Sequence, residues 1–411
     1  MQKDTTWFRN ARFGMFIHWG LYCIPGGIWE GKEMPYIGEW IQSCFRIPNA
    51  IYSQLAKEFN PIHFNADEWI SAAAQAGVRY IVFTTKHHDG FAMYHTRVSD
   101  YNIYNATPFK RDPLAELAAA CEKYDVKLGV YYSHNLDWHE PNGGDPGQDC
   151  PQNVGGMPWG NNWDYPDREH KNFDQYFYDK CLPQLREIFT NYGRINTLWC
   201  DCPLQMTKDY SQQVYDLVTG LQPWCLINSR IGNDLGDYGS MGDNKLPEGY
   251  LDFPAESPVT LNNTWGFKIK DTNWKSPETV ANQLAMLASR NTNYLLNVGP
   301  QPDGRLPQAA MDVFAKLAPW MKTVTNAVHD CKPNPLKSEV PFGYCTTSGN
   351  QLNVFVRDWA EQLVIQDVPS QVLSASVPFK QVGSTLTLLP GPRPDSLLPL
   401  ITVKFDGILY T

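Results

Sequence analysis

The sequence lacks several patterns that would assign it to a common class of binding protein. It has no run of Lys or Arg, and a net charge of −9 with a pI near 5.5 argues against nucleic acid or an anionic membrane as the main partner. Its ten Cys show neither a C-x-x-C pair nor a metal-like Cys/His spacing, so we expect no structural metal site. No stretch approaches the roughly 18 consecutive apolar residues of a transmembrane helix.

The chain also begins without an apolar segment. Residues 1–6 are polar and do not resemble the hydrophobic part of a secretory signal. We therefore expect a cytoplasmic location for the chain as it stands, and a periplasmic or secreted one if a signal has been removed. No internal repeat is evident, and the sequence leaves the oligomeric state open.

The sequence is rich in apolar and aromatic residues. Hydrophobic residues make up 43% and aromatic residues 13%, which predicts a large core and little disorder. The 14 Trp and 21 Tyr exceed the usual needs of such a core. Surplus aromatic rings often line sugar sites, because the apolar face of a pyranose packs on a flat ring; the alternative is a core that is simply rich in Trp.

Short apolar strands alternate with amphipathic helices over the first two-thirds of the chain. The predicted strands are residues 13–18, 80–85, 128–133, 197–201, 225–230 and 294–298. Near-continuous apolar runs indicate strands buried on both faces, as in a parallel sheet. Asp112 is a predicted N-cap in front of Pro113. Asn65 or Asp67 begins another helix, which Gly77 ends.

This α/β pattern predicts either a (β/α) barrel or a doubly wound sheet. A doubly wound sheet often carries a glycine-rich phosphate loop after its first strand, and none is present. Polar residues instead end most of the strands: His18, His87, Ser133, Asp201 and Arg230. In a barrel those ends meet at one mouth, where catalysis takes place. We therefore predict a (β/α)8-like barrel over residues 1–330.

Two segments depart from the alternation. Residues 142–167 are rich in Gly, Pro, Asn and Asp and too long for a tight turn, so they form either an active-site loop or an irregular surface loop. After residue 330 the pattern changes to short alternating strands separated by turn signals, at 352–356, 363–365, 385–389 and 400–405. We predict that residues 331–411 form a small C-terminal β-sandwich.

Three clusters at the predicted mouth carry groups suited to binding a sugar. His18 ends the first strand, and Glu39 and Trp40 follow on the next loop. His87 and His88 end the second strand. Each could contact sugar hydroxyls or stack on a sugar ring, although each alone is also an ordinary structural or solvated residue. A metal at the two histidines is disfavoured, because adjacent side chains on extended chain point apart.

Two further clusters carry carboxylates. Asp201 ends an apolar strand, where a carboxylate is costly unless it is paired or used. A glycosidase nucleophile must be an ionised carboxylate, and a structural salt bridge is the alternative. Glu256 lies in an apolar setting beside Pro254, which would raise its pKa as a general acid requires. By itself Glu256 is one glutamate among many.

In this order, the clusters resemble the α-L-fucosidases of glycoside hydrolase family 29. The matching stretches run from about residue 7 to residue 304 and are WFRNARFGMFIHWGLY, GEW, TKHHDGFAMY, GVYYS, LWCD, INSRIG, AESPVTLNNTWGF and NYLLNVGPQPDG. The resemblance implies retaining hydrolysis of terminal α-L-fucose from fucosylated oligosaccharides or glycoconjugates, without a metal or organic cofactor.

The same resemblance implies roles for single residues. Asp201 matches the nucleophile, and Glu256 resembles the acid/base, whose position varies within the family. The residues that match the fucose pocket are His18, Glu39, Trp40, His87, His88, Tyr131 and Arg230. Tyr132 is the adjacent alternative to Tyr131. Trp40 and Trp265 are expected to cover the C5 methyl group of fucose.

Two other functions stay open at this point. One is a different exo-glycosidase on the same barrel, accepting an L-galacto-configured sugar. The other is a non-catalytic fucose-binding homologue. The presence of both Asp201 and Glu256 argues against the second, because a lectin needs neither carboxylate.

Overall fold

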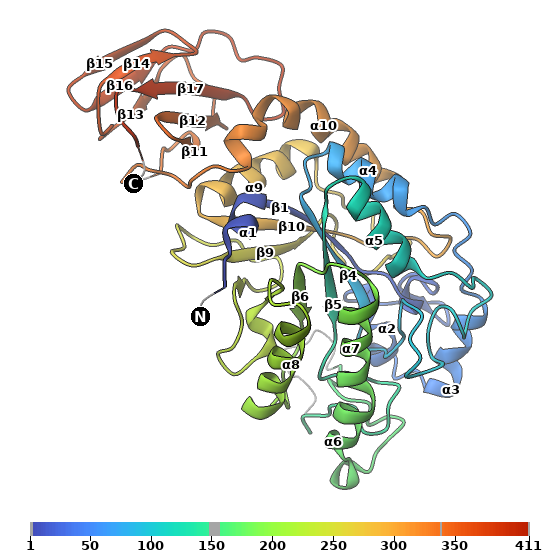
Figure 1. The fold of residues 1–411 in the computed structure, drawn as a ribbon. Helices are drawn as coiled ribbons and strands as arrows, with labels where there is room; N and C mark the ends of the chain where they lie inside the picture. Colours follow the sequence, from blue (N-terminus) through green and yellow to red (C-terminus); the bar gives the residue numbers. More distant parts are fainter. Residues whose placement is uncertain (1–2, 148–156, 338, 410–411) are drawn as a thin grey trace.

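Eight parallel strands form the centre of the molecule (Figure 1). The computed structural model describes residues 3–147, 157–337 and 339–409. The strand order is β7-β6-β5-β4-β1-β10-β9-β8, and a bridge between Asn228 and Tyr238 links the two outer strands. The sheet therefore curls round on itself, which confirms the predicted (β/α)8-like barrel.

The strands of the barrel agree with five of the six predicted runs and shorten the other. Their bounds are β1 Phe13–Ile17, β4 Tyr80–Lys86, β5 Lys127–Tyr132, β6 Thr197–Cys200, β7 Leu226–Ile227, β8 Gly239–Ser240, β9 Ala255–Thr260 and β10 Thr292–Val298. The run predicted at 225–230 is a two-residue strand followed by a 3₁₀ turn, Ser229–Ile231. The short strand β8 was not predicted. Neither was β9, because Glu256, Ser257 and Pro258 interrupt its apolar pattern.

Helices cover the outside of the sheet. They are α4 Ala66–Gln75, α5 Pro113–Lys123, α6 Phe173–Tyr176, α7 Leu182–Asn191, α8 Lys208–Leu221, α9 Pro277–Ser289 and α10 Gln308–Val328. The side chain of Asn65 caps α4 and that of Asp112 caps α5, each accepting from a backbone N–H two or three residues inside the helix. Between β7 and β9 the described chain has no α-helix, so the barrel is irregular on that side.

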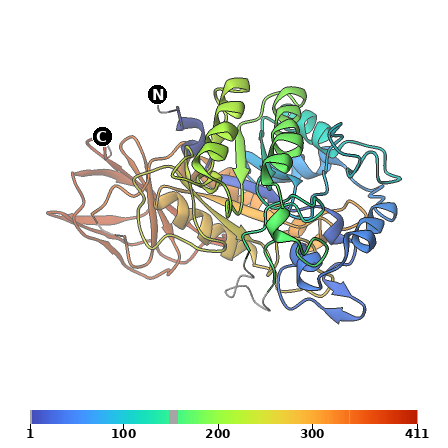
Figure 2. The same ribbon diagram turned by 90° about the horizontal axis from the view of Figure 1, so that it is seen from below.

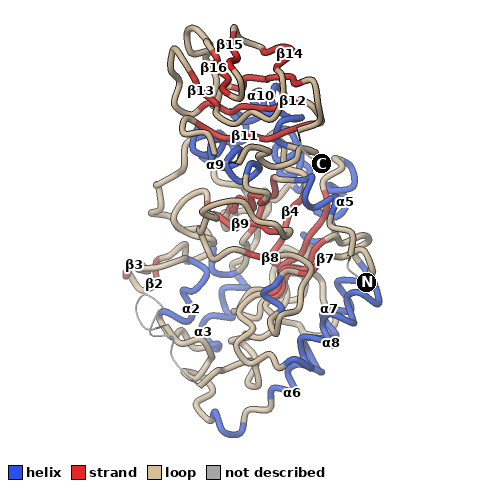
Figure 3. Tube along the Cα trace, turned by 90° about the vertical axis from the view of Figure 1, so that its left-hand side faces the viewer, coloured by secondary structure: helices blue, strands red, loops and turns tan. Residues whose placement is uncertain are grey.

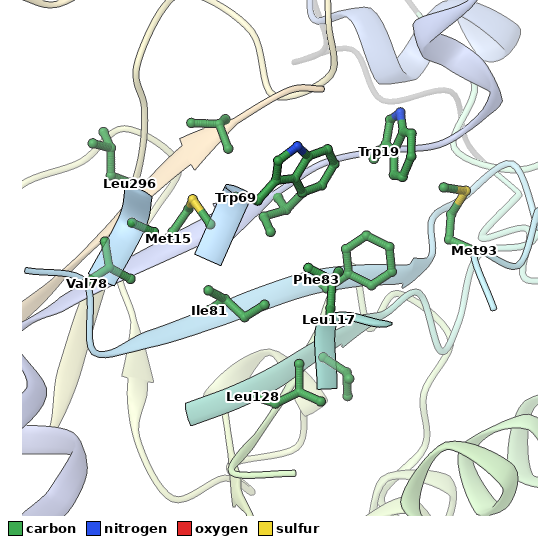
Figure 4. Close-up of a cluster of buried hydrophobic side chains, with 14 of the residues drawn as sticks. Met15, Trp19, Trp69, Val78, Ile81, Phe83, Met93, Leu117, Leu128 and Leu296 are labelled. Atoms are coloured by element: carbon green, nitrogen blue, oxygen red, sulfur yellow. The ribbon is translucent and has the colours of Figure 1, made fainter. Parts of the chain in front are cut away.

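Strand side chains alternate between the helices and the barrel interior. Met15, Ile81 and Leu128 point outward into the layer between sheet and helices (Figure 4). Phe16, Tyr80, Tyr131, Trp199 and Leu295 belong to a separate cluster inside the barrel. The short helix α1 Thr6–Ala11 adds to this inner cluster, with the ring of its Phe8 5.7 Å from Tyr80. The alternation decides which side chains can reach the mouth.

Two small segments follow β1 on the way to α4. A hairpin pairs β2 Ile28–Trp29 with β3 Lys32–Glu33 and projects to one side of the barrel (Figure 3). The helices α2 Ile41–Cys44 and α3 Asn49–Tyr52 come next. A 3₁₀ turn, Gly38–Trp40, lies between hairpin and helices and carries the predicted Glu39 and Trp40.

The C-terminal part is a sandwich of two antiparallel sheets, as predicted. One sheet has the order β11-β12-β17-β14 and the other β13-β16-β15. Their bounds are β11 Gly343–Ser348, β12 Gln351–Val356, β13 Leu363–Ile365, β14 Val372–Ala375, β15 Phe379–Val382, β16 Thr385–Leu388 and β17 Leu400–Phe405.

The sandwich lies beside α9 and α10, to one side of the barrel (Figure 2). The indole N–H of Trp320 on α10 donates to the carbonyl of Leu398 at 2.9 Å. The hydroxyl of Thr346 donates to the carbonyl of Ala327 at 2.6 Å. The boundary at residue 330 stays a prediction. Among the described helices, none is long and apolar enough to cross a membrane.

Candidate active site

A cavity of about 200 Å³ opens where the strands end at the mouth of the barrel. Its lining is Phe16, His18, Tyr36, Ile37, Glu39, Trp40, His87, His88, Trp159, Trp199, Asp201, Cys202, Arg230, Asp243 and Trp265. Drug-sized ligands usually occupy about 300–1,000 Å³, so this cavity suits a single sugar ring. Seven of the eight predicted sugar-contacting residues line it; the eighth, Tyr131, lies beneath it and touches Asp201.

Asp201 is the most heavily contacted carboxylate in the cavity. It follows β6 directly, and its side chain is 15% exposed. Arg230 Nη1 donates to Oδ1 at 3.0 Å, and the hydroxyl of Tyr131 donates to Oδ2 at 3.1 Å. The backbone N–H of Cys202 also donates to Oδ1 at 3.0 Å. Three donors thus fix the orientation of the carboxylate and leave it open to the cavity on one side.

These contacts keep Asp201 ionised. Burial alone would raise the pKa of its carboxyl, but the charge of Arg230 and the hydrogen bonds from Arg230 and Tyr131 outweigh burial and lower the pKa below its usual value. Burial likewise opposes the charge of Arg230, while Asp201 and Asp243 raise the pKa of its guanidinium. The site therefore presents an ionised carboxylate, the form that can attack an electrophilic carbon.

Three neutral imidazoles surround the cavity. Burial lowers the pKa of His18 to about 3 and that of His88 to about 4, and it holds the pKa of His87 well below its usual value. A neutral imidazole offers one donor and one acceptor, which matches a sugar hydroxyl. His87 stacks on the ring of Tyr131 at 5.3 Å, and its Nδ1 has no partner among the described residues. A ligand could take up this open position.

Glu39 adds a protonated carboxyl to the wall. Burial raises its pKa to about 8, against the opposing hydrogen bond that Oε2 accepts from the backbone N–H of Gly266 at 2.8 Å. At neutral pH the group can both donate and accept. Trp40 and Trp265 belong to the apolar part of the lining, and the ring of Trp265 lies 5.3 Å from that of His18.

The structure distinguishes Tyr131 from Tyr132. Tyr131 faces the barrel interior and contacts Asp201. Tyr132 points outward, where its hydroxyl donates to Gln184 on α7 at 2.8 Å. Strand alternation separates the two neighbours onto opposite faces of β5.

Glu256, the predicted acid/base, lies outside the lining of the cavity. It is the second residue of β9 and is 0% exposed. Its Oε1 accepts from Trp199 Nε1 at 2.6 Å, and its Oε2 accepts from the hydroxyl of Tyr80 at 2.9 Å. Burial raises the pKa of its carboxyl to about 7, with both hydrogen bonds acting in the opposite direction.

One acidic residue of the cavity, Asp243, was not predicted. Asp243 follows β8, lines the cavity, and its side chain is 51% exposed. Its Oδ1 accepts from Arg230 Nη2 at 2.5 Å, so one guanidinium contacts both Asp201 and Asp243. Asp243 lies in an irregular polar loop, and nothing in its neighbouring residues marks it as functional.

Other lining residues also come from loops. Trp159 belongs to the segment 142–167, which supports its interpretation as an active-site loop; residues 148–156 of that segment lie outside the described residues. Tyr36 and Ile37 precede the 3₁₀ turn that carries Glu39. Aromatic and apolar loop residues are common in all proteins, so sequence periodicity does not single these out.

Three lining residues also offer atoms that could hold a metal ion. His88, Asp201 and Cys202 place one ligand atom each within 4.8 Å of one another. A mixed nitrogen, oxygen and sulfur set suits zinc or a similar ion. The same atoms are also explained by a nucleophile and the groups that orient it, and hydrolysis between two carboxyl groups requires no metal.

Comparison with known proteins agrees with this geometry. The family model described as alpha-L-fucosidase matches residues 1–326. The tissue alpha-L-fucosidase of Bos taurus is 25% identical over 377 residues, which cover 86% of this chain and 75% of that protein.

Solved structures give the same result. The alpha-L-fucosidase AlfC from Lactobacillus casei, in complex with its alpha-L-fucose product, is 46% identical with a TM-score of 0.74, covering 79% of this chain and 100% of that chain. An alpha-L-fucosidase from Vibrio sp. strain EJY3 is 31% identical with a TM-score of 0.91, covering 99% of this chain and 74% of that chain. Because the family model spans most of the sequence and the barrel ends in a pocket of matching chemistry, the chain belongs to the alpha-L-fucosidase family and is an exo-acting glycoside hydrolase for terminal α-L-fucose.

Proposed function

We propose that Asp201 is the nucleophile and Asp243 the acid/base of a retaining double displacement. The observation that carries this proposal is the bridge through Arg230, which contacts both carboxylates at the mouth of the barrel. A retaining glycosidase needs two carboxyl groups about 5–5.5 Å apart, on either side of the scissile bond. A shared guanidinium is a direct way to hold them near each other.

The choice of Asp243 over Glu256 rests on geometry. The raised pKa of Glu256 would suit a general acid, but a general acid must also reach the oxygen that it protonates. The leaving group of an exo-glycosidase projects out of the mouth, and water enters by the same route. Asp243 is half exposed there, whereas Glu256 is closed off beneath Trp199. We therefore replace the predicted acid/base.

In the first step, Asp201 attacks the anomeric carbon while Asp243 gives its proton to the leaving oxygen. This forms a β-fucosyl ester on Asp201 and releases the aglycone. In the second step, Asp243 takes a proton from water, which attacks the same carbon and frees Asp201. Both steps pass through an oxocarbenium-like transition state, and the two inversions give net retention.

The remaining lining residues would bind the sugar. His18, His87, His88 and Glu39 would share hydrogen bonds with the hydroxyls of fucose. His18 and His88 would accept through Nε2, because Nδ1 of each already contacts Asn297 or Ser133. Trp40 and Trp265 would cover the C5 methyl group. A pocket of this size holds the terminal residue alone, which fits exo-action.

The substrates are fucosylated oligosaccharides or glycoconjugates. One variant of AlfC has been solved with Fucα(1,6)GlcNAc and with 4-nitrophenyl α-L-fucopyranoside. A net charge of −9 without a basic cluster also favours neutral glycans over nucleic acid or an anionic membrane.

Azide rescue with 4-nitrophenyl α-L-fucoside tests both roles. Asp201→Gly should lose about three orders of magnitude in kcat or more, and azide should restore turnover with β-fucosyl azide as product. Asp243→Ala should also lose activity, and azide should then yield the α-azide from the fucosyl-enzyme. A Glu256→Ala enzyme that gives the α-azide, beside an Asp243→Ala enzyme that does not, would reverse the assignment.

A further inference from the structure

Glu256 is a buried carboxylate that the proposed reaction does not use. It is 0% exposed, yet both of its oxygens accept directed hydrogen bonds from ring side chains, Trp199 and Tyr80. A carboxyl group inside a barrel is costly to bury. An apolar residue of the same size would avoid that cost. The presence of a carboxyl group at this position is therefore explained by a specific contact that it makes.

Trp199 connects this carboxylate to the nucleophile. The guanidinium carbon of Arg230 lies 4.6 Å from the centre of the Trp199 ring. The ring of Tyr131 stacks on the same indole at 5.6 Å with an angle of 22° between the planes. The side chains of Arg230 and Tyr131 both donate to Asp201, at 3.0 and 3.1 Å. Both side chains therefore pack against the indole of Trp199.

The indole has one polar atom, Nε1, and its N–H donates a hydrogen bond to Glu256. The Trp199 Nε1–Glu256 Oε1 distance of 2.6 Å is short for a hydrogen bond that an N–H donates to an oxygen. Phe16, whose ring lies 5.0 Å from the indole, offers no acceptor to this N–H. Without the carboxylate the buried N–H would lack its acceptor and the ring could turn. A shift of about 1 Å at reacting atoms is enough to cost two orders of magnitude in rate.

We propose that Glu256 is a positioning residue that acts through Trp199 on the orientation of Asp201. This inference rests on the proposed role of Asp201 as nucleophile. It assigns to Glu256 a function in the same reaction without contact with the substrate.

The first experiment compares three variants with wild type on 4-nitrophenyl α-L-fucoside. Glu256→Met removes the acceptor at similar volume and should lower kcat about 100-fold with KM changed less than threefold. Glu256→Gln keeps an oxygen for Trp199 Nε1 and should stay within about fivefold of wild type. Tyr80→Phe removes the donor to the other oxygen of the same carboxylate and is the matched control, with an expected loss under threefold. Equal losses in Glu256→Met and Tyr80→Phe would overturn the proposal.

The second experiment asks whether the effect passes through Asp201. In an Asp201→Gly background with azide as external nucleophile, adding Glu256→Met should change the rate less than threefold. A further 100-fold loss would mean that Glu256 acts elsewhere. If Glu256→Met alone yields α-fucosyl azide, the residue is the acid/base and the inference fails.

A third experiment keeps the test independent of azide rescue. If Asp201→Gly is not rescued, the nucleophile assignment fails, while the Glu256–Trp199 contact can still be judged. Trp199→Phe keeps a ring and removes the N–H. Its double variant with Glu256→Met should lose no more activity than the worse single variant. Additive losses would overturn the proposal, and Glu256→Leu replaces Glu256→Met in the same cycle where the latter folds poorly.

Discussion

His88 Nδ1 lies 2.7 Å from Ser133 Oγ, and this contact fixes the tautomer of the histidine. The Ser133 hydroxyl donates its single hydrogen to the carbonyl of Leu136 at 2.8 Å, so it accepts from His88 Nδ1–H. The lone pair of Nε2 then faces Asp201 Oδ2 at 3.7 Å. Two acceptors face each other there, and a sugar hydroxyl between them would donate to either one.

Ser133→Ala should therefore weaken catalysis without removing any group that touches the sugar. The imidazole loses the acceptor that orients it, and we expect kcat/KM to fall by about 10-fold, on the order of one lost buried hydrogen bond. Thr85→Val is the control, because it removes an equally buried hydroxyl bonded to a backbone carbonyl. Equal losses in both variants would show that the tautomer is unimportant.

Arg230→Gln should shift the pH profile as well as lower the rate. In the wild type, burial raises the pKa of Asp201 and Arg230 lowers it to a net value below normal. Without the guanidinium the pKa rises, so the acid limb of kcat/KM should move to higher pH, with a loss of about 100-fold or more at the optimum. Arg230→Lys should lose at least about 10-fold, because a point charge cannot contact two carboxylates as a planar fork does. An unmoved acid limb would contradict the electrostatic role.

Glu39→Gln should remove the alkaline limb from the pH profile of kcat/KM. Burial raises the pKa of Glu39 to about 8, so the carboxyl is neutral below that pH and ionises as the pH rises through it. Ionisation would add a second negative charge to the pocket near Asp201 and weaken binding of the sugar hydroxyls. We expect wild-type kcat/KM to fall above pH 8. The Gln variant should stay flat there, with a loss below about 10-fold at pH 6. A persistent limb at pH 8 would belong to another group.

Trp265→Ala should relax the choice between fucose and L-galactose, which carries a hydroxymethyl group in place of the methyl. An apolar wall discriminates such a pair by about 10- to 200-fold. We expect the ratio of kcat/KM for the two 4-nitrophenyl glycosides to fall several-fold in the variant. Trp224→Ala is the control, since this residue is 41% exposed and lies outside the pocket. An unchanged ratio in Trp265→Ala would place the methyl group against Trp40 instead.

A stability prediction concerns the buried ion pair between Lys86, the last residue of β4, and Asp137. Lys86 and Asp137 are both fully buried at 3.0 Å, and Lys180 lies 3.0 Å from the same Asp137 oxygen. Lys86→Met should lower the free energy of unfolding by about 1–3 kcal/mol, because Lys180 still pairs with Asp137. The exposed pair Lys123–Asp67 is the comparison, and Lys123→Met should lower the free energy of unfolding much less. Urea denaturation followed by circular dichroism measures both, and equal costs would contradict the role of burial.

Much of the fold was predictable because burial restricts the residue types that a strand or a helix can contain. Strands covered on both faces must be apolar along their length, and helix starts need a side-chain cap, so β4, β5 and the caps Asn65 and Asp112 were visible. The strand β9 was hidden, since a carboxylate and a proline interrupt its apolar run.

The site was predictable only in part. Residues at the end of an apolar strand, such as His18 and Asp201, stand out because a polar group there must be used or paired. Asp243 does not stand out, because a carboxylate on an irregular loop is the ordinary case. Only the closure of the barrel, which places the end of β8 beside Arg230, brings it to the nucleophile.

The sequence by itself determined the barrel, the sandwich and the family, since these depend on hydrophobic periodicity and on motifs that stand in fixed order along the chain. The tertiary structure alone decided the depth of each carboxylate. Asp201 follows the last residue of β6 and so reaches the mouth, whereas Glu256 is the second residue of β9 and stays beneath Trp199. The position of a residue along its strand sets its depth in the barrel only when the register between neighbouring strands is known. That register depends on the pairing of all strands in the sheet.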